Sequence, residues 1–116
     1  MSFGSPACDY GENNLDLNRY LSVHPVSCYF MRMRGNALAK SGIFDGDILL
    51  VDRSLPPTDN RLIIAELNGR LLARRYRRNA GKIRLQAEDA SSPVIFPRPE
   101  DQFSVWGVIT SVIRKV

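Results

Sequence analysis

Every second residue of the segment 28–34, beginning at Tyr29, carries a large apolar side chain that would lie on one face of an extended chain. The intervening positions include Arg32 and Arg34, whose charged groups favour solvent. Alternation with a period of two is typical of a half-buried β-strand, because successive side chains of a strand point to opposite faces. The pattern therefore predicts a strand over residues 28–34.

A second pattern predicts a β-hairpin over residues 61–76. Two apolar runs, 61–67 and 70–76, are separated by the pair Asn68-Gly69. A two-residue type I′ turn needs a positive φ at both central positions, and Asn followed by Gly meets that need best. We therefore expect residues 61–67 and 70–76 to pair as antiparallel strands.

Three further segments predict short strands. Residues 47–52 are mostly apolar and follow an Asp-Gly turn, and residues 82–87 form a shorter run of the same kind. Residues 103–113 are rich in β-branched side chains at both odd and even positions. A strand that is apolar on both faces is either covered on both sides or contributes to an interface.

Two short helical turns are also predicted. Residues 16–21 could form one turn, which would stop before Pro25. Residues 36–41 contain helix formers, and we expect Asn36 to cap their first turn and Gly42 to end it. Together with about six or seven strands, these one or two short helical turns predict a mostly β fold.

The chain of 116 residues suits one domain, and its composition, 44% hydrophobic and 24% charged, is that of an ordinary globular protein. Residues 1–14 are rich in Gly, Ser, Pro, Asn and acidic side chains, with few apolar groups to anchor them. We therefore expect a flexible N-terminal arm over residues 1–14 and a folded domain over residues 15–116.

Several classes of function are disfavoured by the sequence. The longest apolar stretches, such as 48–51 and 62–65, are four residues long, whereas a membrane span needs about 20. The N-terminus lacks a secretory signal, so we expect a cytoplasmic protein with no membrane partner. Cys8, Cys28 and His24 do not suffice for a closed zinc site, so we expect no metal and no cofactor. We interpret His24 and Cys28 as a surface histidine and a small buried thiol rather than a base and a cysteine nucleophile.

The net charge of +4 is concentrated in one segment. Residues 67–87 hold seven basic and no acidic residues, while the rest of the chain holds 9 basic and 12 acidic residues. The basic residues of the segment are Arg70, Arg74, Arg75, Arg77, Arg78, Lys82 and Arg84. Arginine pairs with phosphate through its planar fork, so the segment could bind nucleic acid. Since Tyr76 is its one aromatic residue, we favour instead a solvated face that meets acidic groups of this domain or of a partner protein.

Two motifs carry a resemblance to a known family. Residues 35–38 read Gly-Asn-Ala-Leu, and residues 42–47 read Gly-Ile-Phe-Asp-Gly-Asp before an apolar strand. They resemble the LexA/UmuD family of self-cleaving serine peptidases, which carry Gly-Asp-Ser-Met and then Gly-Ile-x-Asp-Gly-Asp. Residues 5–7, 24–25 and 106–109 resemble the UmuD branch of that family. The resemblance covers nearly the whole chain and implies the β fold of the LexA/UmuD C-terminal peptidase domain.

The resemblance places the family's nucleophilic serine at Ala37 and its general-base lysine at Arg74. Alanine has no hydroxyl to attack a carbonyl carbon, and an arginine stays protonated because its pKa exceeds about 12. Ser41, about one turn beyond Ala37, has no evident deprotonating partner and is not expected to replace the nucleophile. The resemblance thus implies a pseudo-peptidase with a degenerate dyad and no catalytic residues of its own.

The first residues also match the resemblance. In the UmuD branch, self-cleavage removes an arm just before a stretch similar to residues 2–7. We therefore expect this chain to correspond to the processed form, without an inhibitory arm to cleave. An alternative is a chain that was deliberately truncated and inactivated. Because Asn36 and Leu38 also depart from the family motif, we favour a natural loss of activity.

The resemblance implies a non-catalytic accessory subunit of an error-prone translesion polymerase in the SOS response. Its expected partners are a second copy of itself, a Y-family polymerase catalytic subunit similar to UmuC, and the RecA filament, with DNA contacted mostly indirectly. An alternative is a regulatory decoy that forms a heterodimer with a cleavable UmuD- or LexA-like relative. Direct nucleic-acid binding through the basic segment is a third hypothesis.

Two sets of contact residues follow from these hypotheses. For a protein partner or nucleic acid, we predict contacts from the basic segment, namely Arg70, Arg75, Arg77, Arg78, Lys82 and Arg84. For a homodimer, we predict the apolar residues of the last strand, namely Val105, Trp106, Val108, Ile109, Val112 and Ile113. The alternative for the last strand is burial on both sides within one monomer.

Overall fold

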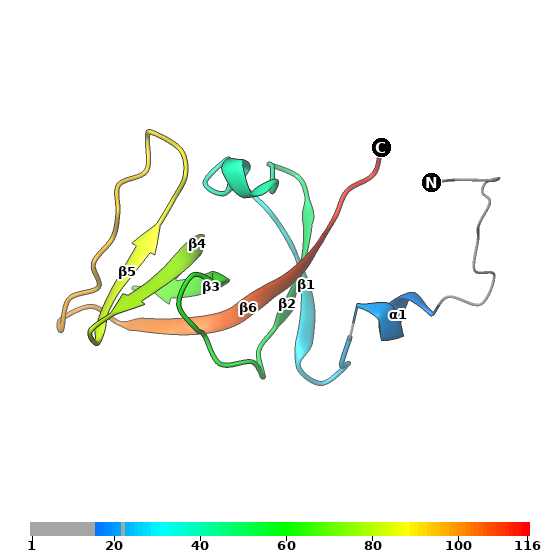
Figure 1. Ribbon diagram of the computed structural model, residues 1–116, viewed down its shortest axis with the longest axis horizontal. Coiled ribbons are helices and arrows are strands. Elements are labelled where there is room, and N and C mark those ends of the chain that lie inside the picture. The colour runs from blue at the N-terminus through cyan, green and yellow to red at the C-terminus, as the bar shows by residue number, and fades with distance from the viewer. Residues whose placement is uncertain (1–15, 22) are drawn as a thin grey trace.

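The computed structural model describes residues 16–21 and 23–116 (Figure 1), so the arm predicted over 1–14 lies outside the described residues. One antiparallel sheet of six strands, in the order β1-β2-β6-β3-β4-β5, forms the fold. The strands are β1 (Cys28–Arg32), β2 (Ile48–Asp52), β3 (Leu62–Leu67), β4 (Arg70–Asn79), β5 (Lys82–Gln86) and β6 (Phe103–Ile113). Among the described residues, one short helix, α1 (Leu17–Tyr20), and one 3-10 turn, η1 (Ala39–Ser41), complete the elements. The predicted mostly β fold is confirmed.

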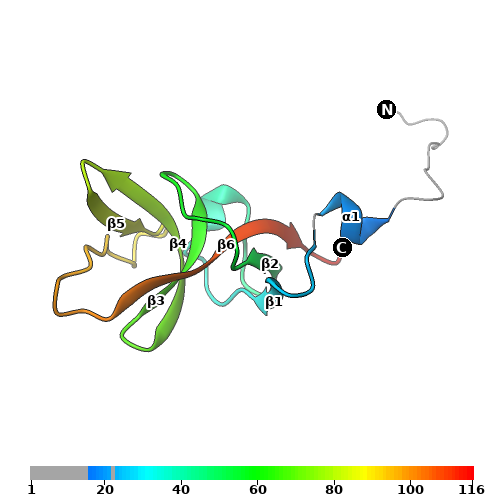
Figure 2. The ribbon, with the colours of Figure 1, turned by 90° about the horizontal axis from the view of Figure 1, so that it is seen from below.

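Strand β6 joins the two halves of the sheet. Figures 1 and 2 show it running through the middle of the molecule, with β1 and β2 on one side and β3, β4 and β5 on the other. Its register shifts once against each neighbour, leaving Thr110 as an extra residue beside β2 and Trp106 as one beside β3. Such bulges bend a strand and increase its twist, so we expect the sheet to bend along β6 between its two halves.

Two hydrophobic clusters correspond to the two halves. The first packs the segment before η1 against β2, β3 and β6, and its buried members are Met33, Ala37, Leu38, Ile43, Leu49, Val51, Ile64 and Ile109. The second lies across β3, β4, β5 and β6, and its buried members are Ile63, Ala65, Tyr76, Leu85 and Val108. The apolar runs predicted as strands therefore supply all buried members of the second cluster, and all of the first except Ala37, Leu38 and Ile43.

The hairpin prediction is confirmed at its turn. Asn68 and Gly69 have φ values of 51° and 83°, and β3 and β4 pair directly on either side of them. A second hairpin joins β4 to β5 through Ala80 and Gly81, with φ values of 52° and 77°. The sequence pattern did not predict this turn, because alanine at its first position is an uncommon choice for a positive φ.

The predicted helical turns form with one correction. Asp16 caps α1, since its Oδ1 accepts hydrogen bonds from the backbone N–H groups of Asn18 and Arg19. The turn predicted over 36–41 is the shorter η1, and the prediction of Asn36 as its side-chain cap is wrong. The N-cap is Leu38, which makes no side-chain bond, and Asn36 contributes only its carbonyl. Within the described residues, no helix is long and apolar enough to cross a membrane.

Candidate functional site

Ala37 and Arg74, the two positions singled out by the sequence, line the same pocket. The pocket has a volume of about 270 Å³ and lies between residues 33–37, the beginning of β4, and the loop that carries Asp89 and Ser92. Ala37 comes from the segment before η1 and Arg74 from β4, which are far apart in the sequence. The sheet therefore brings the two positions into one site.

The segment that carries Ala37 is held in place at three points. The backbone N–H of Gly35 donates to Oδ1 of Asp45 at 2.7 Å, and the Leu38 side chain is fully buried in the first cluster. Between these points, the carbonyl of Ala37 accepts a hydrogen bond from the backbone N–H of Glu88 at 2.6 Å. Ala37 itself is 6% exposed, and its methyl group occupies the position that a serine Oγ would extend.

Arg74 enters the pocket from β4 with its charged group partly withdrawn from water. This burial lowers the pKa of the Arg74 guanidinium, and the Asp89 carboxylate opposes that shift by favouring the charged form. Its Nη1 donates to the carbonyl of Ala73 at 2.9 Å. Its buried Nε and the buried Oδ1 of Asp89 have no hydrogen-bond partner among the described residues. A donor and an acceptor are thus both unoccupied at this pocket.

Asp89 is the anion of the pocket. Hydrogen bonds from Ser92 and Ser91 favour its charged form and lower its pKa, although desolvation acts in the opposite direction. Sequence reasoning missed Asp89 and Ser92. The available signal was the position of the acidic pair Glu88 and Asp89, which directly follows the basic segment.

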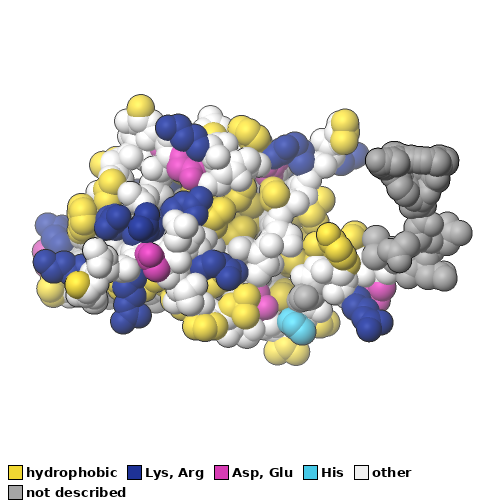
Figure 3. Space-filling model, in the orientation of Figure 1, with side chains coloured by type: hydrophobic (Ala, Val, Ile, Leu, Met, Phe, Trp, Pro, Cys, Tyr) yellow, Lys and Arg dark blue, Asp and Glu magenta, His cyan; other side chains and the backbone are white. Residues whose placement is uncertain are grey.

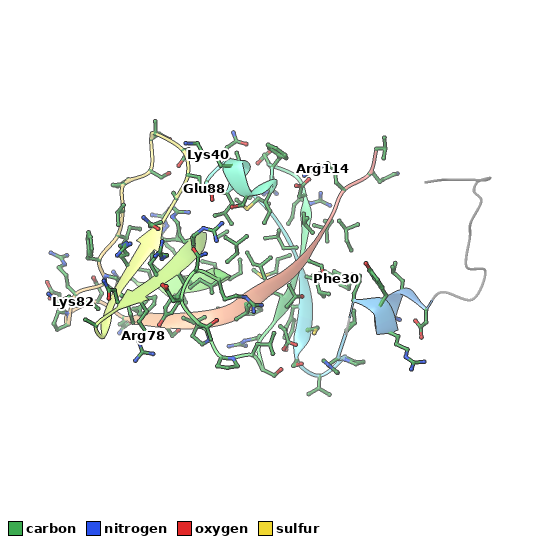
Figure 4. The ribbon with its side chains drawn as sticks, in the orientation of Figure 1. Phe30, Lys40, Arg78, Lys82, Glu88 and Arg114 are labelled. Carbon is green, nitrogen blue, oxygen red and sulfur yellow. The ribbon has the colours of Figure 1, made fainter. Side chains whose placement is uncertain are left out.

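Ser41 lies outside this pocket, in a polar cluster that fastens η1 to β4. Its Oγ donates to Oε2 of Glu88 at 2.6 Å and accepts from Nη2 of Arg75 at 2.6 Å. Arg75 and Glu88 also form an ion pair of 3.4 Å. The sequence showed no deprotonating partner for Ser41, and the fold brings the carboxylate of Glu88 beside its hydroxyl. Figure 4 shows Glu88 and Lys40 together beside η1.

The predicted basic contacts are partly neutralised within the chain. Besides the Arg75–Glu88 pair, Arg77 Nε lies 3.1 Å from Oδ1 of Asp59. The same oxygen accepts from the backbone N–H of Arg78. Across the described residues, no ion pair forms for the remaining predicted side chains, Arg70, Arg78, Lys82 and Arg84. Figure 3 shows Lys and Arg side chains gathered over the β4 and β5 side of the molecule.

The predicted dimer residues of β6 differ in exposure. Val108 and Ile109 are buried in the two clusters, whereas Val105 and Trp106 are half-buried. Val112 and Ile113, near the end of the strand, are 41% and 39% exposed. Side chains covered within the monomer cannot contact a partner, so Val108 and Ile109 are not available for an interface.

Neighbouring side chains from β1 and the end of β2 cover Trp106. The guanidinium of Arg53 lies 4.2 Å from the centre of its ring, and its Nε donates to the Trp106 carbonyl at 2.9 Å. Tyr29 approaches the ring edge-on, with ring centres 5.3 Å apart. These contacts fix the Trp106 bulge within the monomer, as the alternative of burial within one chain requires.

The two residues considered as a thiol and base pair make a structural contact. The backbone N–H of His24 donates to Sγ of Cys28 at 3.3 Å, and the thiol is half-buried. In the part of the chain that the structure describes, no group of three or more His, Cys, Asp and Glu side chains could hold a metal ion. The pocket of Ala37 and Arg74, with its buried unpaired donor and acceptor, is therefore the candidate functional site.

The sequence of this chain is similar to those of several known proteins. A family model described as Peptidase S24-like matches residues 1–110. The chain is 32% identical over 113 residues to Protein SamA of Salmonella typhimurium, covering 97% of this chain and 78% of that protein. It is 32% identical over 121 residues to Protein ImpA of Escherichia coli, covering 97% and 77%. It is also 33% identical over 86 residues to the LexA repressor of Paracidovorax citrulli, covering 74% and 38%. With the match spanning nearly all of its sheet and both sides of its pocket, this chain belongs to the Peptidase S24-like family.

Proposed function

We propose that this chain is a non-catalytic accessory subunit of an error-prone translesion DNA polymerase in the SOS response, similar in role to processed UmuD. One observation carries the proposal: Ala37 and Arg74 lie in a single pocket of a Peptidase S24-like fold. Their positions are those at which the resemblance places the family's nucleophile and base. The similarity to the proteins SamA and ImpA over 97% of the chain supports the proposal that this chain is similar to the UmuD branch of the family.

The chemistry of the pocket supports the absence of cleavage. Attack on a peptide carbonyl needs a nucleophilic oxygen, and the methyl group of Ala37 offers none. The base must be neutral before it accepts a proton, and the guanidinium of Arg74 keeps its proton near neutral pH. Burial lowers the pKa of Arg74, but the carboxylate of Asp89 beside it favours the charged form. We therefore expect the first step of the reaction to fail.

The test of this part is incubation with a peptide that contains a family cleavage sequence, from neutral to alkaline pH. Any specific fragment detected by mass spectrometry from the unaltered chain would contradict the proposal. Ala37→Ser alone is expected to remain inactive, because Arg74 still cannot accept the proton. Ala37→Ser combined with Arg74→Lys is expected to show weak cleavage that rises with pH, as the lysine loses its proton. Ala37→Ser with Arg74→Gln is the matched inactive control.

The proposed homodimer uses the accessible end of the sheet. Ile113 of β6 lies opposite Ile48 of β2, which lies opposite Arg32 of β1. Phe30, two residues before Arg32 on β1, therefore lies on the same face of the sheet as Ile113. Phe30 is 59% exposed, and Figure 4 shows it on the β1 side of the molecule. Exposed apolar side chains grouped on one sheet face are typical of a protein interface. Sedimentation should detect a dimer that Ile113→Glu dissociates, whereas Val94→Glu, at an equally exposed apolar residue, should leave it intact.

Participation in translesion synthesis is tested in cells that lack their own UmuD. Expressing this chain with its matching polymerase subunit should raise damage-induced mutagenesis. The rise should persist in cells whose RecA forms filaments but cannot stimulate cleavage. The decoy hypothesis would instead be supported if mutagenesis fell in cells that carry a cleavable relative and did not rise in cells that lack UmuD. Pull-down under DNA damage would identify the polymerase subunit and RecA as partners or exclude them.

A further inference from the structure

The hairpin of β4 and β5 presents cations on one face in a regular array. Pairing places Arg77 directly opposite Arg84 and Asn79 opposite Lys82. Because side chains alternate between the faces of a strand, these four residues share a face with Arg75 and Gln86. We call this surface the basic ribbon face, and its residues are Arg75, Arg77, Asn79, Lys82, Arg84 and Gln86. Figure 4 shows Lys82 at the turn end of the hairpin, directed away from the rest of the molecule.

The charge of the basic ribbon face exceeds what this chain neutralises. Glu88 pairs with Arg75, and Asp59 pairs with Arg77. Asp59 also lies close enough to Arg84 for the two charges to interact, and this contributes to the lowered pKa of its carboxyl after the larger effect of the Arg78 backbone N–H. The face therefore carries four cations against two carboxylates. Like charges directly opposite each other, as Arg77 and Arg84 are, destabilise a strand pair unless an anion lies beside them.

The residue types on this face favour one class of partner. A protein interface is built around buried aromatic and aliphatic anchors, with charged groups at its rim. Where β4 and β5 pair, over residues 75–79 and 82–86, the basic ribbon face has no apolar side chain, because Tyr76, Ile83 and Leu85 lie on the other face. The apolar residues Leu71 and Ala73 share its face only beyond the paired region. Contact with a phosphate backbone needs no apolar anchor, since cations and hydrogen-bond donors suffice.

The spacing also suits a phosphate backbone. Residues two apart on a strand are separated by about 6.6 Å, so Lys82 and Arg84 present charges in a row with Arg77 beside them. Each guanidinium group can donate two parallel hydrogen bonds to the oxygens of one phosphate. We propose that the basic ribbon face binds the phosphate backbone of a nucleic acid through Arg77, Lys82 and Arg84, independently of sequence. This activity goes beyond the proposed accessory role and does not depend on it.

The proposal is tested by fluorescence anisotropy with the full chain and two probes, an oligothymidine and a duplex of unrelated sequence. Both should bind, and the logarithm of the affinity should fall linearly with the logarithm of the salt concentration. With three contacts, the slope should be about −2 for the single strand and about −3 for the duplex. Lys82→Glu with Arg84→Glu should weaken binding at least about tenfold near 0.1 M salt and remove most of the slope.

Matched variants keep the result interpretable. Arg19→Glu with Lys115→Glu makes the same change in net charge at exposed cations outside the basic ribbon face, and it should leave most of the binding intact. Circular dichroism must show that both double variants are folded. Equal losses in the two double variants, or no binding by the unaltered chain at low salt, would overturn the proposal. Competition by a polyglutamate peptide as effective as that by DNA would also overturn it, because the face would then select acidic protein.

Discussion

Gly107 of β6 lies so close to β2 that adding one carbon atom would test how tightly these two strands pack. A Cβ built there would lie 2.5 Å from Cγ1 of Val51 and 3.4 Å from the carbonyl oxygen of Asp52. Two carbon atoms in favourable contact are about 3.5–4 Å apart, so one of these groups must move by an ångström or more. Val51 is fully buried, and its β-branched side chain has few alternative rotamers.

The net effect of Gly107→Ala follows from two opposing contributions. Overpacking a core by one methyl group costs about 1–3 kcal/mol. Replacing glycine by alanine restricts the unfolded chain, which stabilises the folded state by about 0.4–1 kcal/mol. The steric cost is larger, so we expect the free energy of unfolding to fall by about 1–2 kcal/mol. For a domain of this size, each kilocalorie corresponds to a fall in Tm of roughly 3–6 °C.

A double-mutant cycle with Val51→Ala identifies the cause. Val51→Ala alone should destabilise, because it removes buried methyl groups and leaves a cavity. In that background the new methyl at position 107 enters the vacated space, so Gly107→Ala should become neutral or stabilising. The cycle should therefore give a coupling of about 1–3 kcal/mol. Leu85→Ala, in the other cluster, is the control and should combine additively with Gly107→Ala within about 0.5 kcal/mol.

The assay is urea unfolding followed by circular dichroism and by the fluorescence of Trp106, the only tryptophan. All variants must be compared at one protein concentration, since dimer formation would add to the apparent stability. If Gly107→Ala is as stable as the unaltered chain, or if its effect is additive with Val51→Ala, the packing argument is refuted.

Three other changes probe the contacts that hold the sheet and the pocket together. Hydrogen bonds from Arg114 and the backbone of Phe44 lower the pKa of Asp47 to about 2. The urea midpoint of unfolding should therefore decrease as the pH is lowered from about 4 to about 2, and Asp47→Asn should flatten that dependence. Glu88→Ala should cost about 1–3 kcal/mol in urea unfolding by releasing η1 from β4, with Glu88→Gln less damaging because one acceptor remains. Gly69→Val should cost about 1–3 kcal/mol, measured as a lower Tm, because φ is 83° there.

How far the sequence predicted the fold depended on whether the signal was local. The β3–β4 turn was predictable because Asn68 and Gly69 determine their own φ values. The Ala80 and Gly81 turn was not, because its geometry is imposed by the pairing of β4 and β5 around it. Strand β6 was predicted with its correct bounds, yet its bulges at Trp106 and Thr110 depend on its two neighbours.

The same distinction applies to the candidate site. Motif resemblance indicated Ala37 and Arg74, but their shared pocket exists only because the sheet places β4 beside the segment before η1. Glu88 was not predicted, although it contacts Ser41 through its carboxylate and Ala37 through its backbone. The acidic pair Glu88 and Asp89 after the basic segment indicated an anionic group near it, but no local pattern indicated which distant residues Glu88 would contact.

These contacts determine whether cleavage by the Ala37→Ser, Arg74→Lys double variant tests the loss of the two catalytic side chains alone. The backbone at Ala37 is fixed by hydrogen bonds to Asp45, through Gly35, and to Glu88, and none of these bonds involves the side chain at position 37. The position of Arg74 is likewise set by the pairing of β4 with β3. Serine and lysine introduced at positions 37 and 74 would therefore meet an existing scaffold. Failure of the double substitution to cleave would then indicate that the pocket itself no longer accepts a peptide in a reactive geometry.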